Sequence, residues 1–289
     1  MPRCYLPIPV AVLSALSLLI SACQKIPAAE DPTRTNVDLS STAQSRLPAV
    51  VLPQPKFGIF RAGTFGMRYT LTMGTGFSEL SVLFGRDGDI PLIGDWDGNR
   101  TITVGVYRLS EATFYLRNSN TPGSPDVAVR FGSPKSVPVV GDWDGDGKAT
   151  IGIFDRSRGV FSLLNADSAN GKPLVVPFGK AGDWPVTGDW DGDGKTTIGV
   201  FRRGTFYLRN SNSSGKADII VHLGTAGDIP LSVSRTDQKS DSVAVFRPAI
   251  GTFFFLDSLS DTSHQRAVTF GITGDVPITG QWHASRKRK

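Results

Sequence analysis

The feature that most constrains this 289-residue chain is an internal repeat of about 47 residues that begins near Phe57. Five Phe-Gly or Leu-Gly pairs start at residues 84, 131, 178, 223 and 270, so successive copies are 47, 47, 45 and 47 residues apart. Each pair is followed seven residues later by a proline. A fixed period of this length is typical of solenoids and propellers, in which every copy is one supersecondary unit.

Each copy contains several short apolar runs, as residues 197–201, 204–209 and 218–221 illustrate for the third copy. The runs are four to six residues long, rich in β-branched and aromatic residues, and separated by Gly, Asn, Asp and Ser. This pattern predicts short antiparallel strands joined by tight turns. Four such strands per copy is the number found in one propeller blade.

The two ends of the repeat region complete one another. Residues 57–65 align without a gap on residues 198–206, whereas the copy that begins at Phe270 ends before it reaches that segment. We therefore predict an all-β fold, a five-bladed β-propeller with about 47 residues per blade, closed by N- and C-terminal half-blades. A linear solenoid is the alternative, but it needs capping repeats and gives no reason to divide one copy between the two ends.

Three segments are predicted: 1–22 as a signal peptide, 23–55 as a lipidated Cys with a flexible Pro-rich tether, and 56–289 as the propeller domain with a basic tail. The first has a basic start, an apolar run and a small-residue end. Its apolar run is shorter than a membrane-spanning helix requires. Because the only other cysteine, Cys4, leaves with the signal, we expect no disulfide.

The end of the first segment, Ile20-Ser21-Ala22-Cys23, resembles the lipobox of bacterial lipoproteins. The resemblance implies acylation of Cys23 and a lipid-anchored protein of the cell envelope. Gln24 implies the outer membrane if the cell has one, and otherwise the outer face of the cytoplasmic membrane. The alternative is an ordinary signal peptide with a chance cysteine.

The charge and the composition argue against two classes of function. Of the net charge of +5, residues 286–289 supply four and Arg3 supplies one, so the rest of the chain sums to zero and nucleic-acid binding is not expected. Only three His and three Glu occur, which leaves few candidates for acid–base catalysis. We therefore expect a protein that is not an enzyme. We also expect a monomer.

Three copies carry an Asp-rich loop after the proline. Carboxylates at loop positions 1, 3 and 5, with a carbonyl at position 7, give converging hard oxygen ligands that suit Ca²⁺. The first copy has Asn at position 5, and all three lack an acid at position 12, so we expect low affinity. The alternative is that these side chains only cap a turn. The candidate ligands are Asp95, Asp97, Asn99, Thr101, Asp142, Asp144, Asp146, Lys148, Asp189, Asp191, Asp193 and Lys195.

The order of Phe-Gly, Asp-x-Asp-x-Asp-Gly and an apolar Ile/Val-Gly-Val-Phe strand resembles the bacterial relatives of FG-GAP and VCBS-type propeller repeats. The resemblance covers residues 57–284 and implies a β-propeller with calcium-binding loops. The chain departs from the pattern at Gly182-Asp183-Trp184-Pro185, where the family has Gly-Ala-Pro. The fourth copy lacks the acidic loop but keeps its strands, so a blade forms without it.

A few further residues are candidates for ligand binding. Trp184 occurs in one copy only, whereas the Trp of the Asp-rich loops recurs and is expected to be a wedge between blades. The turns at Arg117-Asn118 and Arg209-Asn210 could bind a glycan or simply form hairpins. We predict a non-catalytic adhesion or interaction module that recognises a protein or a carbohydrate. The alternatives are a structural envelope-assembly component and a five-bladed glycoside hydrolase.

Overall fold

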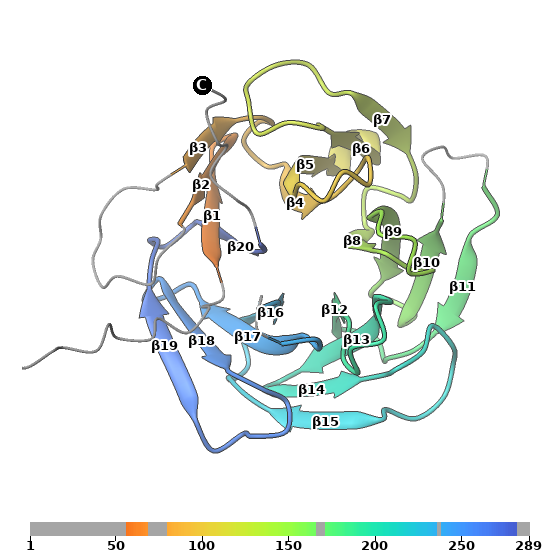
Figure 1. Ribbon diagram of the computed structural model, residues 1–289, viewed down its shortest axis with the longest axis vertical. Helices are drawn as coiled ribbons and strands as arrows, with labels where there is room; N and C mark the ends of the chain where they lie inside the picture. Colours follow the sequence, from red (N-terminus) through yellow and green to blue (C-terminus); the bar gives the residue numbers. More distant parts are fainter. Residues whose placement is uncertain (1–55, 69–79, 166–170, 236–237, 282–289) are drawn as a thin grey trace, which may run out of the picture. The chain divides into compact units, whose positions relative to one another are not determined.

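A computed structural model describes residues 56–68, 80–165, 171–235 and 238–281. Within these residues, twenty short strands form five four-stranded sheets arranged around a common centre, which confirms the predicted five-bladed propeller (Figure 1). The strands are β1 (Phe57–Arg61), β2 (Thr64–Met67), β3 (Leu80–Leu83), β4 (Ile90–Gly94), β5 (Thr103–Arg108), β6 (Thr113–Leu116), β7 (Val127–Arg130), β8 (Val137–Gly141), β9 (Thr150–Asp155), β10 (Val160–Leu164), β11 (Leu174–Pro177), β12 (Trp184–Gly188), β13 (Thr197–Arg202), β14 (Thr205–Leu208), β15 (Ile219–His222), β16 (Ile229–Val233), β17 (Ser242–Arg247), β18 (Thr252–Leu256), β19 (Gln265–Thr269) and β20 (Val276–Thr279). One 3-10 turn, η1 (Leu109–Glu111), joins β5 to β6.

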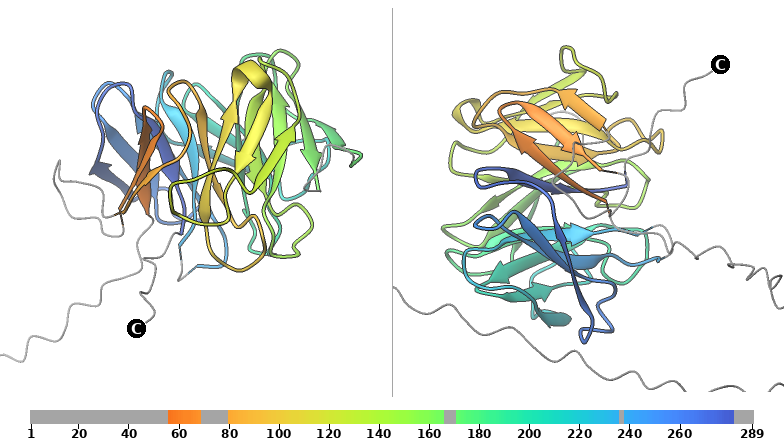
Figure 2. Two further views of the ribbon diagram at one scale, coloured as in Figure 1. Left: turned by 90° about the horizontal axis from the view of Figure 1, so that it is seen from above. Right: turned by 90° about the vertical axis from the view of Figure 1, so that its left-hand side faces the viewer.

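Every sheet is an antiparallel meander. The four sheets that follow the chain are β4–β7, β8–β11, β12–β15 and β16–β19, here called blades 1 to 4. In each, the first strand lies innermost, and neighbouring inner strands contact one another around the whole ring, β20 and β4 included. Figure 2 shows the same sheets from two sides, twisted as short antiparallel sheets are.

The fifth sheet, blade 5, closes the ring with strands from both ends of the domain, in the order β20-β1-β2-β3. Phe57 lies opposite Thr279 and Phe60 opposite Val276, and the backbone N–H of Gly280 donates to the carbonyl of Lys56 at 3.3 Å. The predicted sharing of one blade is therefore confirmed. The division is one strand to three rather than two halves, because only the proline-bearing strand remains to be supplied after residue 270.

The local sequence explains the hairpins. In blade 3, β13 and β14 pair from Arg202 opposite Thr205, which leaves a two-residue loop of Arg203 and Gly204. Their φ angles are +47° and +90°, the left-handed conformation that a type I′ hairpin requires at both positions. A Cβ at Gly204 would lie 2.6 Å from the carbonyl oxygen of Gly224, so the turn also needs glycine for space.

The apolar core lies between blades rather than within them, because both faces of each inner pair of strands are buried. One cluster joins Trp190 and Phe206 of blade 3 to Val243 and Val245 of blade 4. The recurring tryptophans Trp96, Trp143 and Trp190 are 3 to 8 % exposed, and each indole N–H donates to the backbone carbonyl eight residues later. The expectation of a tryptophan wedge between blades is confirmed for these three copies.

A buried ion pair recurs at the opposite end of the inner strands. In blade 3 the guanidinium of Arg202 donates two hydrogen bonds, of 2.7 and 2.6 Å, to the carboxylate of Asp183. Asp183 is 2 % exposed and also accepts the backbone N–H of Lys180. The same bidentate pair joins Arg108 to Asp89, Arg247 to Asp228 and Arg61 to Asp275.

Blade 2 is the exception to this ion pair, and it departs at both positions. Ser136 stands in place of the acid, and its hydroxyl accepts the backbone N–H of Ser133 at 3.0 Å. The strand residue that is Arg in the other blades is Asp155, whose carboxylate instead binds Ser157 and Arg158 in its own turn. The two positions therefore change together, as expected if an unpaired charge there is unfavourable.

The predicted signal peptide (1–22), the acylated Cys23, the tether (23–55) and the basic end of the chain (282–289) lie outside the described residues. Among the residues that are described, no helix has the length and hydropathy needed to cross a membrane.

Candidate metal loops and central cavity

The three Asp-rich loops follow the inner strands β4, β8 and β12, so they lie side by side at one rim of the ring, here called the acidic rim. Backbone hydrogen bonds connect each loop to the next blade. The N–H of Ala149 donates to the carbonyl of Asp95 at 2.8 Å, and Thr196 donates to Asp142 in the same way at 2.7 Å. These hydrogen bonds hold each loop in a defined position relative to the next blade.

The first aspartate of each loop organises the turn. In blade 3, one carboxylate oxygen of Asp189 accepts the N–H of Gly192 at 2.8 Å, and the other accepts the N–H of Gly194 at 2.9 Å. Asp142 of blade 2 makes the equivalent bonds to Gly145 and Gly147, at 2.8 and 2.7 Å. Turn capping, which the sequence offered as the alternative to metal binding, is therefore present in the structure.

Capping leaves room for a metal ion, because an ionised carboxylate has about four acceptor directions. Asp142, Asp144 and Asp146 each offer an oxygen within 4.8 Å of the others. Asp189, Asp191 and Asp193 form a second triad of the same kind. In each triad the second and third carboxylates are exposed, so an ion could reach them from solvent.

The ionisation of the blade 2 loop is shaped by its surroundings. Burial raises the pKa of Asp142, although backbone N–H groups of its own loop oppose this effect. The side-chain amide of Asn165, which donates to Asp144, lowers the pKa of that carboxyl. Asn165 comes from the end of β10, so this strand supports the loop from beside it.

The first loop differs as the sequence suggested. Asn99 replaces the third acid, and its amide donates to Asp97 at 3.0 Å. Arg100 has a φ of +66° where the other two loops have Gly147 and Gly194, a conformation that is unfavourable for a residue with a side chain. Position 7 is alike in all three loops, since the backbone N–H of Thr101, Lys148 and Lys195 donates to the position 5 side chain at 2.8 Å.

Blade 4 shows what replaces an acidic loop. Arg235 is 7 % exposed and occupies the position of the wedge tryptophan. Its guanidinium donates a hydrogen bond of 2.7 Å to the carboxylate of Asp257, the residue that follows β18. An ion pair therefore stands where blades 1 to 3 bury an indole ring.

In each of the two Arg-Asn turns, the arginine and asparagine form hydrogen bonds to other residues of the same turn. The guanidinium of Arg209 donates to the carbonyls of Ser213 and Lys216, both at 2.6 Å, and the N–H of Asn210 donates to Asp218 at 2.9 Å. Arg117 and Asn118 make the corresponding bonds to Thr121, Ser124 and Asp126. A glycan at either turn would have to compete for these donors, so the geometry favours the hairpin alternative.

Trp184 lies at the other rim, at the start of β12. It is 41 % exposed, and the guanidinium of Arg156 from blade 2 stacks over its ring at 3.8 Å. Beside it is a cavity of about 440 Å³ that is also lined by Arg203 and Gly227. The structure thus places Trp184 in a concave surface, apart from the acidic loops.

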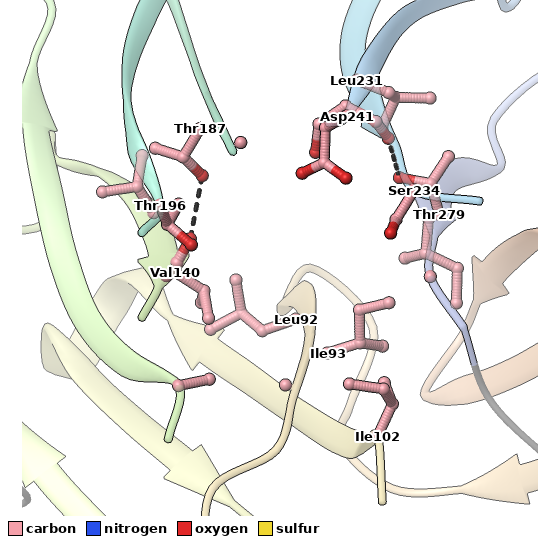
Figure 3. Close-up of a pocket in the computed structure, with 18 of the residues that line it drawn as sticks. Leu92, Ile93, Ile102, Val140, Thr187, Thr196, Leu231, Ser234, Asp241 and Thr279 are labelled. Carbon is pink, nitrogen blue, oxygen red and sulfur yellow. Dashed lines mark hydrogen bonds between the residues drawn. The ribbon is translucent and has the colours of Figure 1, made fainter. Parts of the chain in front are cut away.

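A larger hollow, here called the central cavity, runs between the five inner strands and has a volume of about 450 Å³ (Figure 3). The recurring prolines line it, together with residues from the acidic rim such as Asp95, Asp142 and Asp241. Sequence analysis did not single out Asp241, although the repeat places it at the position of Thr196 and Ala149. Burial raises the pKa of Asp241 to about 6, while the N–H of Asp189 and the side chain of Ser234 favour its charged form.

A glycoside hydrolase needs two carboxylates facing the centre, for which the sequence offers the non-repeated acids Glu79, Glu111, Asp155 and Asp167. Glu111 and Asp155 are absent from the described lining of the central cavity, and each is held by neighbours on the outside of a blade, Tyr115 for the first and Ser157 for the second. Glu79 and Asp167 lie outside the described residues.

Comparison of the chain with family models, with curated proteins and with solved structures finds no match in any of the three. The residues themselves therefore define the class: a five-bladed β-propeller with two aspartate triads at one rim and a cavity along its centre.

Proposed function

We propose that this protein is a non-catalytic binding module that recognises a protein or a glycan through loops braced by calcium. The observation that carries the proposal is the acidic rim. Three loops of one design lie side by side there, and two of them hold three carboxylates within 4.8 Å of one another. A bound divalent cation would neutralise these charges and hold the loops in one conformation, and it could also coordinate oxygen atoms of a partner.

The proposal places the module in the cell envelope, held by acyl chains on Cys23 and separated from the membrane by residues 24–55. Its support is the lipobox-like sequence Ile20-Ser21-Ala22-Cys23. Metabolic labelling with an alkyne fatty acid tests it: the wild-type chain incorporates label and fractionates with membranes, and Cys23→Ser does neither. A labelled Cys23→Ser variant would show that the anchor is elsewhere.

Calcium binding gives the first test of the acidic rim. Titration of residues 56–289 with CaCl₂ is expected to show about two sites with Kd of about 10⁻⁴–10⁻³ M. At about ten times Kd, each site adds about 1.4 kcal/mol to the free energy of unfolding, which raises Tm by about 2–4 °C per kcal/mol. Asp144→Asn and Asp191→Asn should each remove one site, since each takes one carboxylate from a triad.

Asp155→Asn is the matched control, because it removes a partly exposed carboxylate outside the triads. It should leave both sites intact. If calcium produces neither heat nor a change in Tm at several times that concentration, or if Asp155→Asn weakens binding as much as the triad variants do, the loops only cap turns.

Recognition is tested on a glycan array and by crosslinking to envelope proteins, each with calcium and with EDTA. Binding that depends on calcium and is lost in the double variant Asp144→Asn, Asp191→Asn supports the proposal. Binding that persists in EDTA would place the recognition surface elsewhere, with the concave surface beside Trp184 as the first alternative.

A further inference from the structure

The central cavity has two chemically different walls, although the repeat makes its positions equivalent. One set of inner-strand positions carries Ile93 and Val140 in blades 1 and 2, but Thr187, Ser232 and Thr279 in the next three. In Figure 3, Leu92, Ile93 and Ile102 lie together on one side of the space, and the threonines, Ser234 and Asp241 lie on the other sides with Val140 and Leu231 among them. A blade needs no polar residue at these positions, since blades 1 and 2 form without one.

A second ring of equivalent positions, at the acidic rim, divides in the same way. It carries Ile102, Ala149, Thr196 and Asp241 in blades 1 to 4. Thr196 accepts the N–H of Asp142 through its hydroxyl at 3.0 Å. Asp241 accepts the N–H of Asp189 through one carboxylate oxygen at 2.9 Å. A neutral hydroxyl is enough to accept this backbone N–H in blade 3. The negative charge of Asp241 in blade 4 is therefore not needed for that hydrogen bond.

The polar wall presents acceptors rather than donors. The hydroxyl of Thr187 donates its proton to the carbonyl of Val140 at 2.8 Å, and that of Thr279 donates to Ser232 at 2.6 Å, so each oxygen is left as an acceptor.

The charge of the cavity has one sign. No Lys, Arg or His is among the described residues that line it. Asp95 and Asp142 reach it as well, and each accepts N–H groups of its own loop with both oxygens. Asp241 accepts one backbone N–H, that of Asp189, and in Figure 3 its carboxylate is directed into the open space.

We propose that the central cavity is a binding site for a small organic ammonium ion, whose charged nitrogen meets Asp241 and the acceptors of blades 3 to 5 while its apolar body packs against blades 1 and 2. A cation with N–H donors satisfies the carboxylate and the hydroxyl oxygens together. An apolar body packs favourably against Leu92, Ile93 and Ile102. A hydrated metal ion or a sugar would instead place polar groups against these apolar side chains, which is unfavourable. The volume of about 450 Å³ lies within the range of small-molecule sites.

Phenethylamine tests the site, with 2-phenylethanol as its neutral counterpart of the same shape. Calorimetric titration is done in EDTA, so that the acidic loops are metal-free and the result is independent of the proposed calcium function. The titration is done at about pH 8, where a carboxylate is ionised and a primary amine is protonated. The amine is expected to bind at least tenfold more tightly than the alcohol, as a charge-assisted hydrogen bond implies.

Two variants assign the site to Asp241. Asp241→Thr reproduces the residue that serves in blade 3, and Asp241→Asn keeps an acceptor for the N–H of Asp189. Both should fold and should lose affinity for the amine by about tenfold or more. Asp87→Asn, which removes the same charge from an exposed residue outside the cavity lining and outside the triads, should bind the amine as the wild type does. The proposal is overturned if the alcohol binds as well as the amine, if neither binds, or if folded Asp241→Thr or Asp241→Asn keeps the wild-type affinity.

Discussion

Removing residues 276–289 is expected to lower Tm of the propeller domain by about 10–20 °C or to abolish its cooperative unfolding. The deletion takes away β20, the innermost strand of blade 5 and the part of the C-terminal region that closes the ring. Burial of Ile278, which is 4 % exposed, contributes about 2–5 kcal/mol, and the backbone hydrogen bonds to β1 contribute about 1 kcal/mol each. Each kcal/mol corresponds to about 2–4 °C for a domain of this size.

Circular dichroism during heating measures this effect, and removal of the basic residues 286–289 alone is the control. The shorter deletion leaves β20 in place and should leave Tm unchanged. A domain that melts at the wild-type temperature without β20 would show that the pairing of β20 with β1 does not hold the ring together.

Arg202→Leu is expected to destabilise the domain by about 2–4 kcal/mol, because it leaves the 2 % exposed carboxylate of Asp183 without its cation. Asp183→Ser should cost less, since Arg202 is 30 % exposed and can reach water. Blade 2 also shows that a serine at this position can accept the backbone N–H. The double variant should be more stable than Arg202→Leu alone, with a coupling free energy of about 1–3 kcal/mol.

Urea unfolding of the four proteins measures the cycle, with Arg203→Leu as the control for loss of an exposed cation one residue away. The control should stay within about 0.5 kcal/mol of the wild type, as is usual for surface substitutions. Strictly additive effects at Arg202 and Asp183 would mean that the bidentate contact contributes no net free energy.

The fold could be predicted from the sequence because its signals are local and repeated. Short apolar runs, turn residues and a constant period fix the number of strands and blades. The split copy, residues 57–65 against the copy beginning at Phe270, then indicates closure. The equal division into half-blades was less accurate, since strand boundaries within a copy depend on pairing that the sequence alone does not show.

The ion pairs and the cavity could not be predicted from the sequence in the same way. Asp183 and Arg202 lie 19 residues apart on different elements, and only the sheet brings them together. In the fourth copy, Asp241 lies immediately before β17 and outside the segment that replaces the acidic loop. Recognising Asp241 required knowing that this position faces the centre of the ring, because the repeat alignment is compatible with either orientation.

The closing sheet also determines where attachments leave the domain. Lys56 and Gly280 are hydrogen-bonded to one another, so both exits of the chain lie next to the start of β1 and the end of β20, on the side that carries the aspartate loops. In the proposed anchored form, residues 24–55 would reach on the order of 30 Å from the first exit if they behave as a coil. An anchored domain would therefore hold its loop-bearing side toward the bilayer at a clearance set by that reach, and would turn the Trp184 side outward.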